Sequence, residues 1–87
     1  MITVKWVLEG HGAGTERVPD TDAAANVIAA ALRQATRTQS PDAQAHVLLT
    51  VLAPLRANMQ REGADHIAQG RSWQDRNGPL FVEIQPG

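Results

Sequence analysis

The sequence predicts an α+β fold, in which a small, mainly antiparallel sheet of three to four strands carries two helices on one face. Two observations lead to this fold class. Both ends of the chain alternate apolar and polar residues, which is the pattern of half-buried strands. Two segments in the middle repeat apolar residues at helical spacing. The expected order is β(β)ααββ, with the two terminal strands adjacent in the sheet.

The first strand is expected at residues 2–9, where Ile2, Val4, Trp6 and Leu8 fall on one face. Val7 is the one apolar residue on the opposite, polar face. Residues 10–14 contain three glycines and predict a permissive loop. Residues 15–18 could return as a short second strand, which Pro19 would end.

The first helix is expected at residues 22–37, after the cap oxygens of residues 20–22. Acidic residues near its start and arginines near its end complement the helix dipole and so stabilise the helix. Its apolar stripe consists of Ala24, Val27, Ile28, Ala31, Leu32 and Ala35. The alanines in this stripe would allow another element to approach closely.

The second helical segment is expected at residues 40–61, because Ser40 is a good cap and Pro41 suits the first helical position. Pro54 lies inside it and removes a helical hydrogen bond at a cost of about 3 kcal/mol. The segment is therefore either one kinked helix or two helices that meet near Ala53. An alternative makes residues 46–52 a buried strand in a split β-α-β, ferredoxin-like arrangement. The helix is preferred because spacings of three and four run through Ala45, Leu48, Leu52, Leu55 and Met59.

The C-terminal part predicts a hairpin. Gly63 is expected to end the second helix, and residues 65–74 are expected to contain a weak strand. Asn77-Gly78 is a turn signal between two strands. The last strand is expected at residues 80–85, where Phe81 falls on the polar face opposite the apolar residues.

The composition limits the classes of function. The chain has 87 residues, 43% of them hydrophobic, with no cysteine and a formal net charge of −1. We expect one compact domain over residues 1–87. The missing cysteines exclude disulfides, thiolate metal sites and a cysteine nucleophile, and they fit a reducing cytoplasm. The dispersed arginines argue against nucleic-acid binding. No apolar run reaches the roughly 20 residues that span a bilayer, so we expect a soluble protein with no membrane partner.

No residue pattern indicates catalysis, a cofactor or a metal. The three histidines, His11, His46 and His66, are far apart in the sequence and predict no metal site. Gly10, Gly12 and Gly14 follow a strand, as phosphate-binding loops do, but the sequence lacks the ending of a P-loop. A hairpin turn is the preferred interpretation of this stretch. A ligand loop that also uses His11 is the alternative.

Two apolar residues on the polar faces of the terminal strands suggest a binding surface. If the strands are adjacent, Val7 and Phe81 would form an apolar patch, which we expect Trp73 to extend and Arg71 and Arg76 to flank. The leading hypothesis is a small, non-enzymatic cytoplasmic protein that binds a protein partner or a second copy of itself. Inhibitors, immunity proteins, antitoxins and anti-defence factors of bacteria and phages are of this type. A small enzyme or ligand-binding domain built on residues 10–14 is the alternative.

Overall fold

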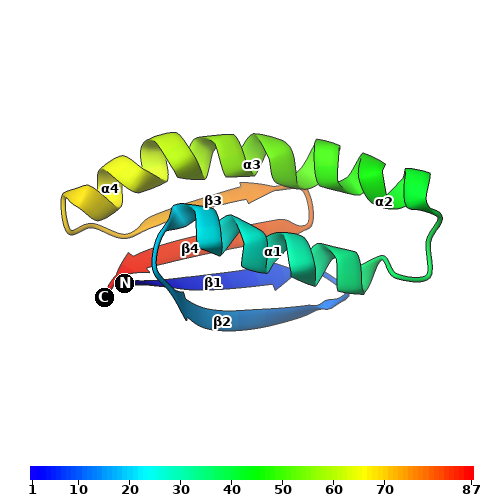
Figure 1. Cartoon of the computed structure of the whole chain (residues 1–87), viewed down its shortest axis with the longest axis horizontal. Coiled ribbons are helices and arrows are strands. Elements are labelled where there is room, and N and C mark those ends of the chain that lie inside the picture. Colours follow the sequence, from blue (N-terminus) through cyan, green and yellow to red (C-terminus); the bar gives the residue numbers. More distant parts are fainter.

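The computed structural model describes residues 1–87 and contains one four-stranded antiparallel sheet with helices on one face (Figure 1). The strands are β1 (Ile2–Leu8), β2 (Gly12–Val18), β3 (Trp73–Asn77) and β4 (Leu80–Pro86). Their order in the sheet is β2-β1-β4-β3. The predicted α+β class is confirmed, and the terminal strands β1 and β4 are neighbours at the centre of the sheet.

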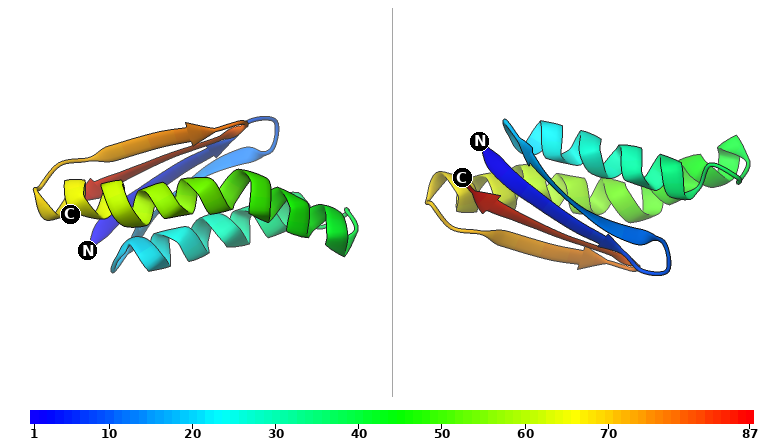
Figure 2. Two further views of the ribbon diagram at one scale, coloured as in Figure 1. Left: turned by 90° about the horizontal axis from the view of Figure 1, so that it is seen from above. Right: turned by 90° about the horizontal axis from the view of Figure 1, so that it is seen from below.

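The core lies between the sheet and the helices. Alternation in the strands buries Ile2, Val4 and Leu8 in β1, and Leu80, Val82 and Ile84 in β4. The remaining members of a 16-residue apolar cluster come from the helices and the edge strands. Both helices lie on this side of the sheet, and the other side carries no helix (Figure 2).

Helix α1 (Thr21–Ala35) begins where the acidic residues before it predicted. The Asp20 carboxylate accepts a hydrogen bond of 2.8 Å from the Ala23 N–H, which satisfies one of the free donors at the helix start. Ala24, Ala25 and Ala29 are buried, so the helix approaches the sheet closely. It ends two residues earlier than expected, and the buried Thr36 hydroxyl donates to the Leu32 carbonyl at 2.8 Å.

Residues 41–68 form one continuous helix, made of five segments that alternate between α and π geometry. The segments are α2 (Pro41–Val47), η1 (Leu48–Leu52), α3 (Ala53–Asn58), η2 (Met59–Gly63) and α4 (Ala64–Ala68). The Ser40 hydroxyl caps its start by accepting from the Ala43 N–H at 3.2 Å. The single-helix interpretation therefore holds, and residues 46–52 are not a strand.

The helix tolerates Pro54 because its hydrogen-bond pattern changes before the proline. In η1 the Ala53 N–H bonds to the Leu48 carbonyl, five residues back. Pro54 has no N–H to offer the Thr50 carbonyl four residues back. The Asn77 side chain of β3 supplies the missing donor, because its Nδ2 lies 3.0 Å from the Thr50 oxygen and 2.8 Å from the Val51 oxygen. A strand residue thus completes the helix at its proline.

The expectation that Gly63 ends this helix is wrong. Gly63 is buried, and an added Cβ would lie 3.0 Å from Cδ1 of Ile84 and 3.3 Å from Cδ2 of Trp73. The glycine is needed because the helix crosses the sheet at close range. The helix continues to Ala68, and Gly70, with φ of 74°, ends it. Residues 65–68 are therefore helical, and the strand begins only at Trp73.

Both hairpins turn more tightly than expected. Strand β2 begins at Gly12, because Gly12 and Gly14 pair with Leu8 and Trp6 of β1. The second turn consists of residues 78–79, since Asn77 pairs with Leu80. Gly78 has φ of 60°, which glycine adopts without strain. The Asn-Gly signal therefore located the hairpin but placed its turn one residue too early.

Candidate functional site

One face of the sheet is uncovered, and we call it the open face (Figure 2). On this face Val7 of β1 lies directly opposite Phe81 of β4, as the adjacency of the terminal strands predicted. Val7 is 44% exposed and Phe81 is half-buried. Register continues this row to Ala13 of β2 and Arg76 of β3, so an apolar strip crosses three strands and a cation follows it on the fourth.

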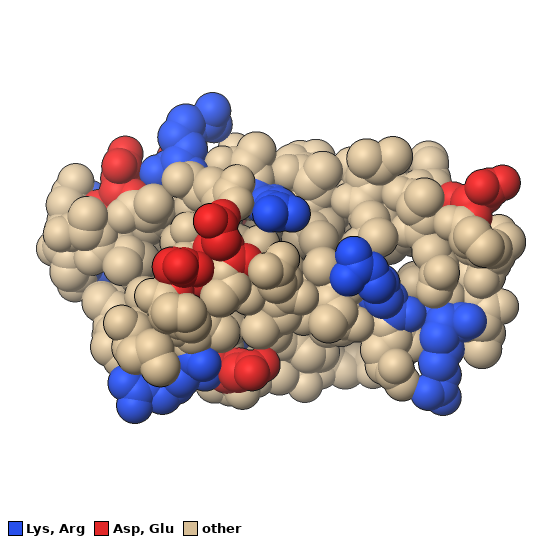
Figure 3. Space-filling view, in the orientation of Figure 1, with Lys and Arg blue, Asp and Glu red and all other residues tan.

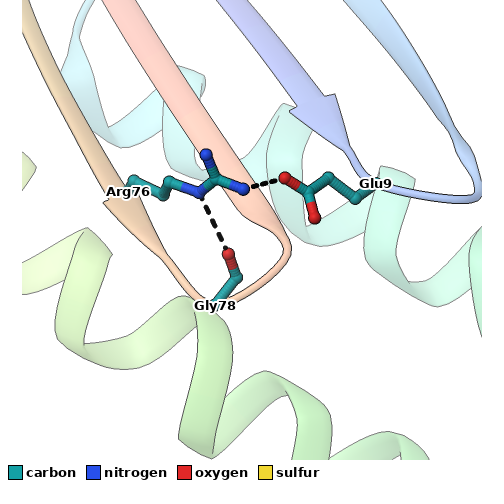
Figure 4. A network of polar contacts seen from close by, with 3 residues as sticks. All are labelled: Glu9, Arg76 and Gly78. Atoms are coloured by element: carbon teal, nitrogen blue, oxygen red, sulfur yellow. Dashed lines mark hydrogen bonds and ion pairs between the residues drawn. The ribbon is translucent and has the colours of Figure 1, made fainter.

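Paired charges surround the strip. Arg76 forms an ion pair with Glu9, and its Nε donates to the Gly78 carbonyl at 3.3 Å (Figure 4). The two side chains are 57% and 58% exposed, so the pair contributes at most about 1 kcal/mol. In the next row Lys5 lies opposite Glu83. The open face therefore presents both signs of charge around an apolar centre.

The structure does not bring the other two predicted residues to this strip. Trp73 pairs with Ile84, which faces the helices, and it is 5% exposed in the core. Arg71 is exposed in the connection between α4 and β3, at the opposite end of β3 from Arg76. Sequence reasoning could not assign the face of Trp73, because residues 75–77 resembled a turn. It also missed two residues. The β1–β2 register places Ala13 in the strip, and the ion pair with Arg76 places Glu9 beside it.

The glycine-rich stretch forms a tight turn and the start of a strand. Gly10 has φ of 80° in the turn, and Gly14 lies against the Trp6 ring. A Cβ on Gly14 would be 2.6 Å from the ring, so glycine makes room for the indole. The start of α1 follows the far end of β2 and cannot point at this turn. Gly10 and Gly14 thus have structural roles. His11 lines an open cavity of about 510 Å³ beside the last turns of α1.

The histidines and acidic residues do not gather into a metal-binding group. No three His, Asp or Glu side chains are grouped closely enough to hold a metal ion. His46 is exposed, and His66 Nδ1 lies 2.7 Å from the Glu62 carbonyl. Acidic and basic side chains are interspersed over the surface seen in Figure 3. None of the helices combines the length and hydropathy that crossing a bilayer would require.

Similarity to known proteins adds no further constraint. No protein-family model, curated protein or solved structure matches the chain. The open face and the cavity beside His11 are the two most distinctive surfaces of the molecule.

Proposed function

We propose that the protein is a non-enzymatic binding protein that recognises another protein through the open face of its sheet. The observation that carries this proposal is the pair Val7 and Phe81, which lie side by side on the two central strands with no helix over them. Contiguous apolar patches that solvent can reach often mark interaction surfaces. Aromatic residues and arginine are enriched in such surfaces, which fits the position of Arg76 beside Phe81.

The partner that best fits the open face has an apolar centre and charges of both signs, and a second copy of this chain meets that description. In an isologous contact the same patch faces itself, so it needs both members of each charge pair. Lys5 with Glu83, and Arg76 with Glu9, provide them. The proposal includes a cytoplasmic setting, which the absence of cysteine favours. It also includes the inhibitor, immunity, antitoxin or anti-defence class, whose members act by occupying a partner.

The test is the association state of a Val7→Ser/Phe81→Ala variant, measured by sedimentation equilibrium over a range of concentrations. We expect the wild-type chain to dimerise and the variant to remain monomeric with an unchanged circular dichroism spectrum. Leu49→Ser is the matched control, because Leu49 is 70% exposed on the helical side of the molecule. The control variant is expected to dimerise like the wild type.

Two results would count against the proposal. If the open-face variant dimerises as strongly as the wild type, the contact lies elsewhere. If the wild-type chain is monomeric throughout, a second copy is not the occupant. In that case a different protein must be the partner, and it must bind the wild type and the Leu49→Ser variant but not the open-face variant. If no such partner is found, the open face has no binding role.

A further inference from the structure

A second surface lies on the helical side of the sheet, away from the open face. It is the open cavity of about 510 Å³ between the last turns of α1, the end of β1 and the β1–β2 turn. This volume is in the range of small-molecule sites. A smaller hollow of about 160 Å³ shares Leu8, His11 and Ala35 with it. The cavity lies at the end of the sheet where the helices extend beyond the strands (Figure 1).

The apolar part of the cavity lining includes one flat surface, the indole of Trp6. Trp6 and Leu8 come from β1, while the apolar residues that α1 contributes are the small Ala31 and Ala35. The indole of Trp6 is half-buried and lies against Gly14 of β2. An aromatic ring can stack on such an indole, and pairs of this kind gain about 0.5–1.5 kcal/mol beyond area burial.

The rim of the cavity is rich in hydrogen-bond donors and contains no acid. Its polar side chains are those of His11, Gln34, Arg37 and Thr38. The one ion pair of the chain joins Arg76 to Glu9, so Arg37 has no carboxylate partner. The guanidinium of arginine matches the geometry of a carboxylate. The charge and the donors of the rim are therefore complementary to an anion.

We propose that this cavity binds a small aromatic carboxylate. The ring lies between the Trp6 indole and the alanines of α1, and the carboxylate accepts hydrogen bonds from Arg37, with Gln34 and Thr38 as neighbouring donors. The inference goes beyond the proposed protein-binding function, because Trp6 and the open-face residue Val7 point to opposite sides of β1. The aromatic-carboxylate proposal and the protein-binding proposal can therefore fail independently of each other.

The probe is naphthoate, titrated into the isotope-labelled full chain and followed by NMR. We expect a saturable shift of the Trp6 indole N–H signal, with a dissociation constant on the order of 0.1–1 mM for a fragment of this size. The Trp73 indole N–H should not move, because that side chain is buried in the core. The neutral analogue naphthamide should bind about tenfold more weakly, since it lacks the charge that Arg37 recognises.

Variants separate the two parts of the site. Arg37→Gln should weaken naphthoate binding about tenfold. Arg33→Gln is the matched control, because Arg33 lies on α1 but does not line this cavity, and it should bind like the wild type. Ala31→Leu should abolish binding by filling the space beside the indole, with an otherwise unchanged NMR spectrum.

The proposal is overturned if the Trp6 signal does not saturate by about 10 mM naphthoate, well above the expected range. It is also overturned if naphthamide binds as tightly as naphthoate and Arg37→Gln has no effect, since the rim would then not recognise the anion. Tighter binding of phenyl phosphate than of naphthoate would overturn the assignment to a carboxylate.

Discussion

At the scale of single residues, Asn77 shows how one side chain can couple two elements. Its amide group donates to the carbonyls of Thr50 and Val51, next to the proline that interrupts the helical hydrogen bonds. The sequence identified both Asn77 and Pro54 as important, the first as a turn residue and the second as a helix breaker. It gave no sign that one compensates for the other, because they are 23 residues apart (77 − 54).

We predict that Asn77→Ala lowers the free energy of unfolding by about 1–2 kcal/mol, since the exposed Thr50 carbonyl and the partly buried Val51 carbonyl each lose a donor. Denaturant unfolding measures this change. Asn26→Ala is the control, because Asn26 is exposed on α1, and it should change stability by no more than about 0.5 kcal/mol.

A double-mutant cycle tests whether Asn77 compensates for the hydrogen bond that is missing at Pro54. Pro54→Ala restores an N–H that can bond to the Thr50 carbonyl, so Asn77→Ala should cost less in that background. An equal cost in both backgrounds would mean that Asn77 does not compensate for the proline.

At the scale of elements, the contact between the long helix and the sheet depends on Gly63. A glycine after charged residues is a common helix end, so the sequence predicted a cap. Whether Gly63 ends the helix or allows a close contact with the sheet depends on its distance to Ile84 and Trp73. These residues are far away in the sequence, so no local pattern contains that distance.

We predict that Gly63→Leu destabilises the fold by about 2–3 kcal/mol, because the added side chain must displace the core beneath the helix. Ala57→Leu is the matched control on the exposed side of the same helix, with an expected change within about 0.5 kcal/mol. Both are measured by thermal and denaturant unfolding. A Gly63→Leu variant as stable as the control would show that the helix can move away from the sheet without cost.

The first segment of the long helix is held less firmly than the rest. Helix α2 has no buried residue, whereas α3 and η2 bury Leu55 and Met59. Segments with few buried contacts open locally at low free energy. We predict that amide hydrogens of α2 exchange with solvent at least about tenfold faster than those of α3, as measured by NMR or mass spectrometry. Equal protection of the two segments would indicate that something else covers α2.

At the scale of the whole molecule, the sequence predicted the fold class better than the site. Alternation and helical spacing are properties of neighbouring residues, and they were enough for the α+β class and the central pair of terminal strands. The juxtaposition of Val7 and Phe81 followed from that pairing. The face of the sheet on which Trp73 lies did not follow. The sequence did not place the bounds of β3 correctly, and without those bounds the alternation of side chains cannot be assigned to the two faces. The cavity beside His11 was also not predictable, since it depends on how far the helices extend past the strands.

The central position of β1 and β4 has a consequence for how the protein is made. Of the four strands, β1 is the first to be synthesised and β4 is the last, and the two pair in the register that sets Thr3 opposite Gln85. While β4 is still inside the ribosome, β1 has only β2 beside it, and the helices have half a sheet to cover. Long-range pairings of this kind fold slowly. The nascent chain therefore has to keep its apolar surfaces from aggregating until β4 emerges, because the sheet that covers the core is complete only then.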